Sequence, residues 1–253
     1  MIGGIWNIRG TGKPGRQQAL ADIISKHKLE FIGIQETKKM SFSSQFLKFI
    51  SGPWVFKWIS LPAKNTASGI LVGFRDDKFD VLSHNCFKYC VAVTVVDKLE
   101  GFVWQLVVIY GTPYYEFKME FIAELHDIME NSTVPTLLGG DFNLVRSTAD
   151  KSNGVINCNW ALLFNDWINR WSLIDFKLAN RSFTWSNNQD SLIMSTLDRV
   201  LASTEWALKF PLTTVKALPK PISDHTPLLI DTCSGVSHMP RLFRFEKWWL
   251  EYP

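Results

Sequence analysis

Apolar residues recur along this chain at two spacings, which predict helices and strands in alternation. Helical spacing predicts helices over residues 16–28, 116–130 and 160–171. In the last of these, the apolar residues share one face and form an aromatic stripe typical of core packing: Trp160, Leu163, Phe164, Trp167, Ile168 and Trp171. Short runs rich in Val, Ile, Phe and Trp, bounded by turn-forming residues, predict strands near 30–35, 54–59, 69–75, 79–83, 90–96, 102–110, 136–139, 182–186, 195–202 and 225–231. This alternation favours a mixed α/β layered domain.

Length and composition agree with one folded unit. A chain of 253 residues lies within the range of one large α/β domain, and a hydrophobic fraction of 46% is ample for a core. No run of 18 apolar residues appears, and the N-terminus lacks the basic region and long apolar stretch of a secretory signal. Four cysteines are too few and too scattered for a disulfide framework, so we expect reduced, mostly buried thiols. These features predict an intracellular protein, in the nucleus, the cytoplasm or both.

The net charge of +3 is mildly basic. It permits nucleic-acid binding without requiring it, because affinity for phosphates follows a local basic face rather than the total charge.

Six polar clusters stand at the edges of apolar runs, and together they carry the groups needed for phosphoester hydrolysis. They span residues 6–10, 34–37, 109–113, 139–143, 197–199 and 223–225. Their carboxylates, amides and imidazole can activate water, neutralise phosphoryl oxygens and assist a leaving oxygen. Hard oxygen donors of this kind favour Mg²⁺, or Mn²⁺, over zinc. Because each cluster lies at the edge of an apolar run, a two-sheet sandwich can bring them to one edge.

Other interpretations of these clusters are simpler or fail on spacing. Residues 10–13 resemble part of a phosphate-binding loop, but its first glycine is missing and Pro14 stands where Ser or Thr would hold Mg²⁺. Residues 223–225 have the types of a nucleophilic triad, but neighbours along a chain point to different sides. Taken singly, Asp141 is compatible with an ordinary Asx-turn and Asp198 with a surface ion pair.

Taken together and in this order, the six clusters resemble the metal-dependent exonuclease–endonuclease–phosphatase superfamily. The resemblance is strongest to the apurinic-endonuclease-like nuclease domain of plant-type LINE (non-LTR) retrotransposons, and it runs from about Met1 to Thr232. It implies an α/β fold of deoxyribonuclease type, in which a two-sheet sandwich is flanked by helices in four layers. It also implies a nuclease domain over residues 1–234. Residues 235–253 would then be a linker and the start of a segment leading to a reverse transcriptase domain.

The same resemblance implies roles for individual residues. Glu36 corresponds to the principal metal ligand and is assisted by Asn7, while Asp224 touches a second metal or tunes the site. The remaining roles concern water and phosphate. Asp141 orients or deprotonates the attacking water, Asn143 and Tyr110 contact the phosphate, and Asp198 pairs with His225, which contacts the phosphate or moves a proton.

Duplex DNA is the substrate that the resemblance implies. Residues near the proposed catalytic loops are candidates for backbone contacts: Thr184, Arg146, Lys151, Arg199 and Ser223. Residues 187–195 match the position of a hairpin that probes the DNA groove, and their polar composition favours reading DNA shape rather than bases.

The leading functional hypothesis is therefore a Mg²⁺-dependent endonuclease that nicks duplex DNA and leaves a 3′-hydroxyl to prime reverse transcription. Three alternatives stay open: an apurinic/apyrimidinic repair endonuclease, a catalytically decayed nucleic-acid-binding module, and a small-molecule or lipid phosphatase.

Overall fold

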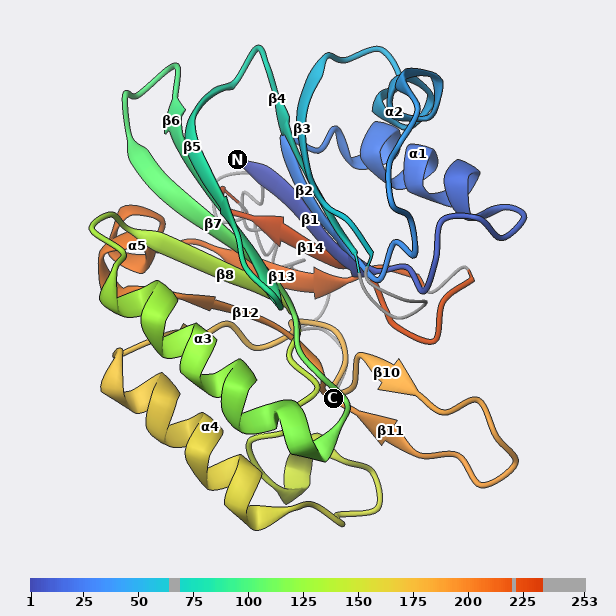
Figure 1. The fold of residues 1–253 in the computed structure, drawn as a ribbon, viewed down its shortest axis with the longest axis vertical. Coiled ribbons are helices and arrows are strands. Elements are labelled where there is room, and N and C mark those ends of the chain that lie inside the picture. Colours follow the sequence, from blue (N-terminus) through green and yellow to red (C-terminus); the bar gives the residue numbers. More distant parts are fainter. Residues whose placement is uncertain (64–68, 220–221, 234–253) are drawn as a thin grey trace, which may run out of the picture.

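Two six-stranded mixed sheets pack face to face, with helices on both outer faces (Figure 1). The computed structural model describes residues 1–63, 69–219 and 222–233. The predicted linker and connecting segment, residues 235–253, lie outside the described residues, as does the end of the predicted domain at residue 234.

The first sheet has the strand order β13-β14-β1-β2-β4-β3. Its strands are β1 (Ile2–Asn7), β2 (Phe31–Gln35), β3 (Phe56–Leu61), β4 (Ile70–Arg75), β13 (Thr214–Ala217) and β14 (Leu228–Asp231). Its outer face packs against α1 (Arg16–His27) and α2 (Ser44–Ser51). The central pair β1 and β2 runs parallel, so Asn7 and Gln35 end side by side.

The second sheet has the strand order β5-β6-β7-β8-β12-β9. Its strands are β5 (Phe79–Cys86), β6 (Cys90–Asp97), β7 (Val103–Tyr110), β8 (Thr136–Asp141), β9 (Ile174–Asp175) and β12 (Asp198–Ala202). Helices α3 (Lys118–Glu130) and α4 (Cys158–Arg170) cover its outer face (Figure 1). A small hairpin, β10 (Trp185–Ser186) and β11 (Met194–Ser195), projects from the body (Figure 1), and its Trp185 forms an isolated bridge with His225 in the loop before β14.

Three apolar clusters separate the four layers. The cluster between the sheets is built around Phe31, Phe74 and Trp104, whose rings meet edge to face or stack. The other two clusters lie under the helices of each sheet. Burial of apolar surface in three layers is the main stabilising term for such a domain.

The predicted fold class is confirmed, and most predicted elements appear within a few residues of their expected bounds. The aromatic stripe of α4 is core as expected, with Trp160, Phe164 and Trp167 buried against the second sheet. Five of the helices and strands were not predicted: β1, α2, α5 (Thr204–Lys209), β9 and β13. Each is eight residues or shorter, too short for a periodic pattern to stand out.

The cysteine prediction was partly wrong. All four cysteines are free, but only Cys90 is buried, whereas Cys86, Cys158 and Cys233 are exposed. Among the described residues, no helix combines the length and apolar character needed to cross a membrane.

Candidate active site

The polar clusters meet where strands of the two sheets end side by side. On the second sheet, Asp141 at the end of β8 lies opposite Asp198 on β12 and beside Tyr110 on β7. Residues opposite each other in a ladder project from the same face of the sheet, so these three side chains point the same way. On the first sheet, Asn7 and Gln35 end the parallel pair β1 and β2; Glu36 directly follows Gln35, and Arg9 follows two residues after Asn7.

Unusual backbone geometry concentrates at this edge. Gly140 has φ of 153°, and a Cβ there would lie 1.9 Å from the carbonyl oxygen of Ile109, so only glycine fits before Asp141. Non-glycine residues Arg9, Glu36, Lys38 and Asn143 adopt left-handed φ values of 50–55°. Such conformations cost free energy and persist where the surrounding structure holds them, commonly at functional sites.

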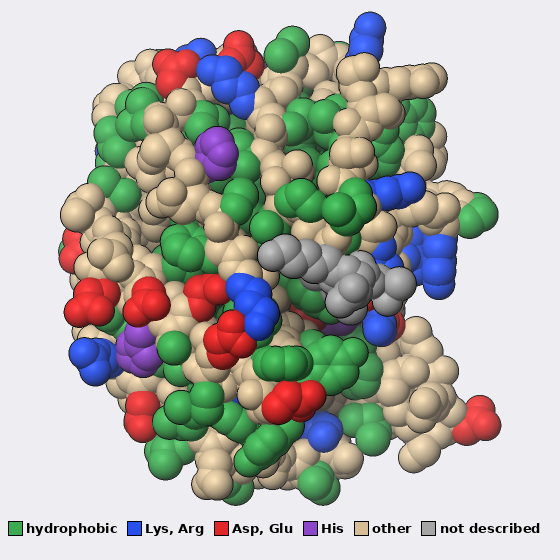
Figure 2. All heavy atoms as spheres, in the orientation of Figure 1, with side chains coloured by type: hydrophobic (Ala, Val, Ile, Leu, Met, Phe, Trp, Pro, Cys, Tyr) green, Lys and Arg blue, Asp and Glu red, His purple; other side chains and the backbone are tan. Residues whose placement is uncertain are grey.

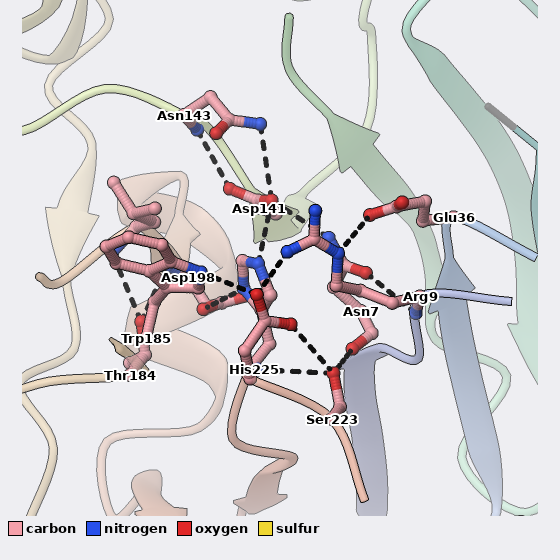
Figure 3. Close-up of polar contacts among 12 residues, drawn as sticks. Asn7, Arg9, Glu36, Asp141, Asn143, Thr184, Trp185, Asp198, Ser223 and His225 are labelled. Atoms are coloured by element: carbon pink, nitrogen blue, oxygen red, sulfur yellow. Dashed lines mark hydrogen bonds and ion pairs between the residues drawn. The ribbon is translucent and has the colours of Figure 1, made fainter. Parts of the chain in front are cut away.

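Asp141 is held by amides on both sides (Figure 3). Its Oδ1 accepts from the Asn143 backbone N–H at 2.9 Å, and its Oδ2 accepts from Asn7 Nδ2 at 2.9 Å and Asn143 Nδ2 at 3.2 Å. The Asn143 amide also donates to the Gly111 carbonyl at 2.7 Å, which ties the loops after β7 and β8 together. The carboxylate is therefore buried, oriented and anchored from both sheets.

His225 lies between two aspartates. Its Nδ1 contacts both carboxylate oxygens of Asp198, at 3.1 and 2.9 Å, and its Nε2 lies 3.6 Å from Asp141 Oδ2. We refer to Asp141, Asp198 and His225 as the carboxylate–histidine cluster. All three residues are at most 3% exposed.

Burial and charge act against each other in this cluster. Burial alone would lower the pKa of His225, but the carboxylates of Asp198 and Asp141 outweigh it and raise that pKa to about 9. Burial raises the pKa of Asp141, although the nearby His225 opposes the shift. At neutral pH the imidazole is protonated and Asp141 is a stronger base than an exposed aspartate.

Ser223 supports the loop that carries His225. Its hydroxyl donates to the Asn7 carbonyl at 2.8 Å and accepts from the His225 backbone N–H at 3.2 Å. The hydroxyl therefore joins the His225 loop to the end of β1.

Glu36 faces two cations on the other side of the site. Its side chain is 5% exposed, with Lys38 Nζ at 3.0 Å from Oε1 and Arg9 Nε at 3.6 Å from Oε2. Asp224, the predicted auxiliary carboxylate, accepts hydrogen bonds from Arg9 Nη1 and from Trp185 Nε1. Burial would raise the pKa of Asp224, but His225 and Arg9 lower it overall.

Tyr110 lies close to both carboxylate groups. Burial, followed by the charges of Glu36 and Asp141, raises the pKa of its phenol well above the ordinary value. The phenol therefore stays protonated and can act as a hydrogen-bond donor.

The oxygen donors at this edge fit a hard divalent cation. Among the described residues, the acidic and histidine groups close enough to share an ion are Asp141, Asp198 and His225, with ligand atoms within 4.8 Å of one another. In that set, however, the His225 Nδ1 is already occupied by Asp198. Glu36 offers a nearly buried carboxylate whose described ion-pair partners are two flexible side chains, Arg9 and Lys38, and carboxylate and amide oxygens suit Mg²⁺.

Thr184 and Arg199, both expected to contact DNA, are buried. Thr184 is 1% exposed, and its hydroxyl accepts from the backbone N–H groups of Leu197 and Asp198, at 3.1 and 3.0 Å. Arg199 is 4% exposed and pairs with Asp150 at 2.5 Å and Asp175 at 2.9 Å. Neither side chain is accessible to DNA. The Thr184 hydroxyl instead orients the backbone at the start of β12.

The remaining three candidates differ among themselves. Arg146 is partly exposed but bonds to Asp175 at 2.7 Å and Asn165 at 2.8 Å. Lys151 lines a depression together with Asn143 and Trp185, beside the carboxylate–histidine cluster. Ser223 is 5% exposed and holds its loop, as described above.

Two residues at the site were missed by the sequence analysis. Arg9 stands two residues after Asn7 in the first polar cluster, so its position was a usable signal. Lys118 donates to the carbonyls of Asn143 at 2.8 Å and Thr112 at 3.2 Å, and burial lowers its pKa. A lysine in the first turn of a helix is disfavoured by the helix dipole, and that anomaly was its only signal.

A model of the endonuclease/exonuclease/phosphatase family matches residues 4–225 of this sequence. The chain belongs to this family. The matched residues run from β1 to His225 and therefore include the residues of the candidate site described above. No curated protein sequence matches the chain.

Solved structures of the same fold include nucleases and a phosphatase. An AP endonuclease from Archaeoglobus fulgidus superposes with a TM-score of 0.71 at 14% identity, covering 91% of this chain and 98% of its own. The endonuclease domain of TRAS1, a telomere-specific non-LTR retrotransposon, gives a TM-score of 0.68 at 14% identity, with coverage of 91% and 97%. A mannosyl-6-phosphatase from Bacteroides thetaiotaomicron gives 0.62 at 15% identity, with coverage of 91% and 98%. At these identities the likeness establishes a shared fold, not a substrate.

Proposed function

We propose that this chain is a divalent-metal-dependent endonuclease that nicks one strand of duplex DNA and leaves a 3′-hydroxyl. The observation that carries the proposal is the carboxylate–histidine cluster, in which Asp141 is anchored by Asn7 and Asn143 and lies 3.6 Å from a protonated His225. Structural similarity to AP endonucleases and to a retrotransposon endonuclease domain supports a nucleic-acid substrate.

Each residue has a defined task in this reaction. Asp141 accepts a proton from the attacking water, which its burial-raised pKa favours. His225, kept protonated and oriented by Asp198, donates a hydrogen bond to a non-bridging phosphate oxygen or a proton to the leaving oxygen. The protonated phenol of Tyr110 is a further donor to the phosphate. The Asn143 amide has both N–H groups directed at Gly111 and Asp141, so it would have to release one of them to contact the phosphate. Acid–base assistance of this kind is worth about 10²–10⁴-fold in rate.

Glu36 and Asn7 are the residues we propose to hold Mg²⁺ or Mn²⁺. Such an ion, when bound, neutralises charge on the phosphoryl group and stabilises the leaving oxygen.

A basic depression beside the site suits the phosphate backbone of DNA. Arg9, Lys13, Arg16 and Lys38 line it, together with Asn188 of the β10–β11 hairpin. Figure 2 shows the hairpin side of the molecule at the lower right, where most of the surface belongs to uncharged groups. We propose that Arg9, Lys13 and Lys38 bind backbone phosphates while the hairpin contacts the groove, and that Lys151 binds a phosphate on another side of the site.

The biological setting follows from this activity. We propose that the nicking product primes target-primed reverse transcription, carried out by a reverse transcriptase domain in a longer protein. Genomic DNA as substrate would require access to the nucleus.

Supercoiled-plasmid nicking in Mg²⁺ tests the proposal directly. We expect conversion to open circle that disappears with EDTA and falls at least about 10²-fold in His225→Ala. Asp166→Ala, an exposed carboxylate on α4, is the matched control and should nick like wild type.

Two further substrates separate the alternatives. A duplex oligonucleotide with one abasic site should be cut no faster than intact duplex, and a strong preference for it would favour a repair endonuclease. A folded protein that leaves plasmid supercoiled but releases phosphate from a sugar phosphate would favour a phosphatase, as in the structurally similar mannosyl-6-phosphatase.

A further inference from the structure

Arg9 places a positive charge between two carboxylates of the candidate site. Its Nη1 donates to Asp224 Oδ2, and its Nε lies 3.6 Å from Glu36 Oε2 (Figure 3). Glu36 and Asp224 come from opposite ends of the chain, and Arg9 is the residue that links them. A cation is thus built into the site beside the proposed metal ligand.

The backbone of Arg9 is fixed at this position. Its φ is 53°, and its N–H donates to Asn7 Oδ1 at 3.1 Å. Its carbonyl accepts from Arg16 Nη1, and Arg16 also donates to the Gly10 carbonyl at 2.9 Å. A left-handed residue held at both its N–H and its carbonyl is pre-positioned for a specific task rather than for solvation.

The guanidinium of Arg9 has an exposed face. Its side chain is 44% exposed, and it lines the same basic depression as Lys13, Arg16 and Lys38. A guanidinium has five N–H donors in a planar fork, and the two carboxylates engage only its Nη1 and Nε. The rest of the fork has the geometry that binds two oxygens of a phosphate.

The charges around the site also limit how many divalent ions it can hold. On the side of the site where the metal would bind, two carboxylates (Glu36 and Asp224) face two cations (Arg9 and Lys38). One divalent ion would bring this set from 0 to +2, and one phosphodiester charge would then reduce it to +1. A second ion would leave an excess of +4 before substrate binds, which is costly in a partly buried site.

We propose that Arg9 is a catalytic residue: its guanidinium binds a non-bridging oxygen of the scissile phosphate and takes the place of a second divalent cation. The site then works with one metal ion. This inference rests on the proposed function only in taking a phosphoester as substrate.

Metal binding is measured first, by calorimetric titration of Mn²⁺ into the whole chain without nucleic acid. Wild type should bind one Mn²⁺ per chain at the site. Arg9→Gln should bind Mn²⁺ about tenfold more tightly, because a positive charge beside Glu36 is gone. Arg170→Gln, the same substitution at the exposed end of α4, should match wild type.

Inorganic phosphate is then titrated into the Mn²⁺-loaded proteins. Arg9→Gln should bind phosphate about tenfold more weakly than wild type, with Arg9→Lys between them because lysine keeps the charge but not the fork. In plasmid nicking at saturating Mn²⁺, the same order should appear in kcat. Tighter metal binding together with weaker phosphate binding is a combination that a merely structural role would not produce.

Three outcomes would overturn the inference. Two Mn²⁺ ions per wild-type chain at the site would refute the single-metal count. Unchanged Mn²⁺ affinity in Arg9→Gln would refute competition for the carboxylates, and unchanged phosphate affinity would refute contact with the substrate. A protein that meets both binding expectations but never nicks plasmid would retain the role of Arg9 and contradict the proposed DNA substrate instead.

Discussion

Two groups of buried charges lie on opposite faces of strand β12, and they differ in how completely the charges are paired. Asp198 belongs to the carboxylate–histidine cluster, whereas its neighbour Arg199 belongs to a network with Arg146, Asp150 and Asp175, here called the arginine network. In the arginine network each carboxylate has an arginine nitrogen within 2.5–2.9 Å. In the carboxylate–histidine cluster a single imidazole lies between two aspartates. Its Nδ1 is 2.9 Å from Asp198 Oδ2, whereas its Nε2 is 3.6 Å from Asp141 Oδ2.

This difference indicates which group is built for stability and which for chemistry. The pKa of Asp175 is lowered overall, because Arg199, Arg146 and Lys177 outweigh the effect of burial, so it stays ionised. The pKa of Asp141 is raised by burial, and that of His225 is raised by the two aspartates. Asp141, whose pKa is shifted toward neutrality, can accept a proton, and His225, whose pKa lies above neutrality, carries a proton that it can donate.

The largest expected effect is the loss of activity in Asp141→Asn. The amide keeps the shape of the side chain but cannot accept a proton from water, so plasmid nicking should fall about 10²–10⁴-fold. Its free energy of unfolding should change far less than that of the arginine-network variant below, because no buried cation is left without a partner. Initial nicking rates and urea unfolding measure the two quantities. Wild-type nicking by this variant would remove Asp141 from the mechanism.

Asp175→Asn should show the reverse profile. It leaves Arg199 and Arg146 with one anionic partner fewer in a buried network, and breaking such a pair costs about 3–5 kcal/mol. Nicking per folded molecule should stay within a few-fold of wild type at a temperature where both proteins are folded. An Asp175→Asn variant with the same free energy of unfolding as wild type would show that the arginine network does not stabilise the fold.

The two groups should contribute to the free energy of unfolding with opposite pH dependence: the contribution of His225 falls as pH rises, and that of Asp175 falls as pH decreases. The pKa of His225 is raised in the folded state, to about 9 from about 6.5, so its contribution is complete below pH 6.5 and is lost as pH rises through 9. The pKa of Asp175 is lowered, so its contribution is present above about pH 3.9 and is lost as pH falls.

Urea unfolding of wild type, His225→Gln and Asp175→Asn from pH 3 to 10 tests these signs. The difference between wild type and His225→Gln should shrink on the alkaline side, and that between wild type and Asp175→Asn on the acid side. A difference for His225→Gln that stays flat from pH 6.5 to 9 would contradict its raised pKa.

The smallest effect concerns one lysine beside each group, the half-buried Lys151 and the exposed Lys177. Lys151→Gln should weaken duplex binding modestly and lower the slope of log affinity against log salt by about 0.9, with little sequence dependence. Lys177→Gln, which removes an exposed partner of Asp175, should leave DNA binding unchanged and cost less than about 1 kcal/mol of stability. Equal salt slopes for wild type and Lys151→Gln would exclude a phosphate contact at Lys151.

Much of the fold was predictable because hydrophobic periodicity is a local property. The stripe of α4 and the apolar runs of β2, β4, β6 and β7 appear where the pattern placed them. Helix α2 was not predicted because it spans only Ser44–Ser51. Its two turns are too short for a helical spacing of apolar residues to stand out. Strand β9 has two residues and exists only through its pairing with β12.

The candidate site was partly predictable for a similar reason. The resemblance named the residues of the carboxylate–histidine cluster, because each stands in its own motif at a strand end. The same procedure assigned Arg199 and Thr184 to DNA, since a side chain's direction depends on register across the sheet. Arg199 lies opposite Gly140 and Asp198 opposite Asp141, so neighbours in sequence serve different faces.

The sequence by itself determined the layered α/β architecture and the set of polar groups available for phosphoester chemistry, because both are written in local patterns of residue type. Only the tertiary structure decided which charges compensate one another. It brought Arg9 between Glu36 and Asp224, and it left Arg199 paired with Asp150 and Asp175. The physical reason is that Coulomb energy and desolvation depend on distances and burial, which strands far apart in sequence acquire only when the two sheets pack.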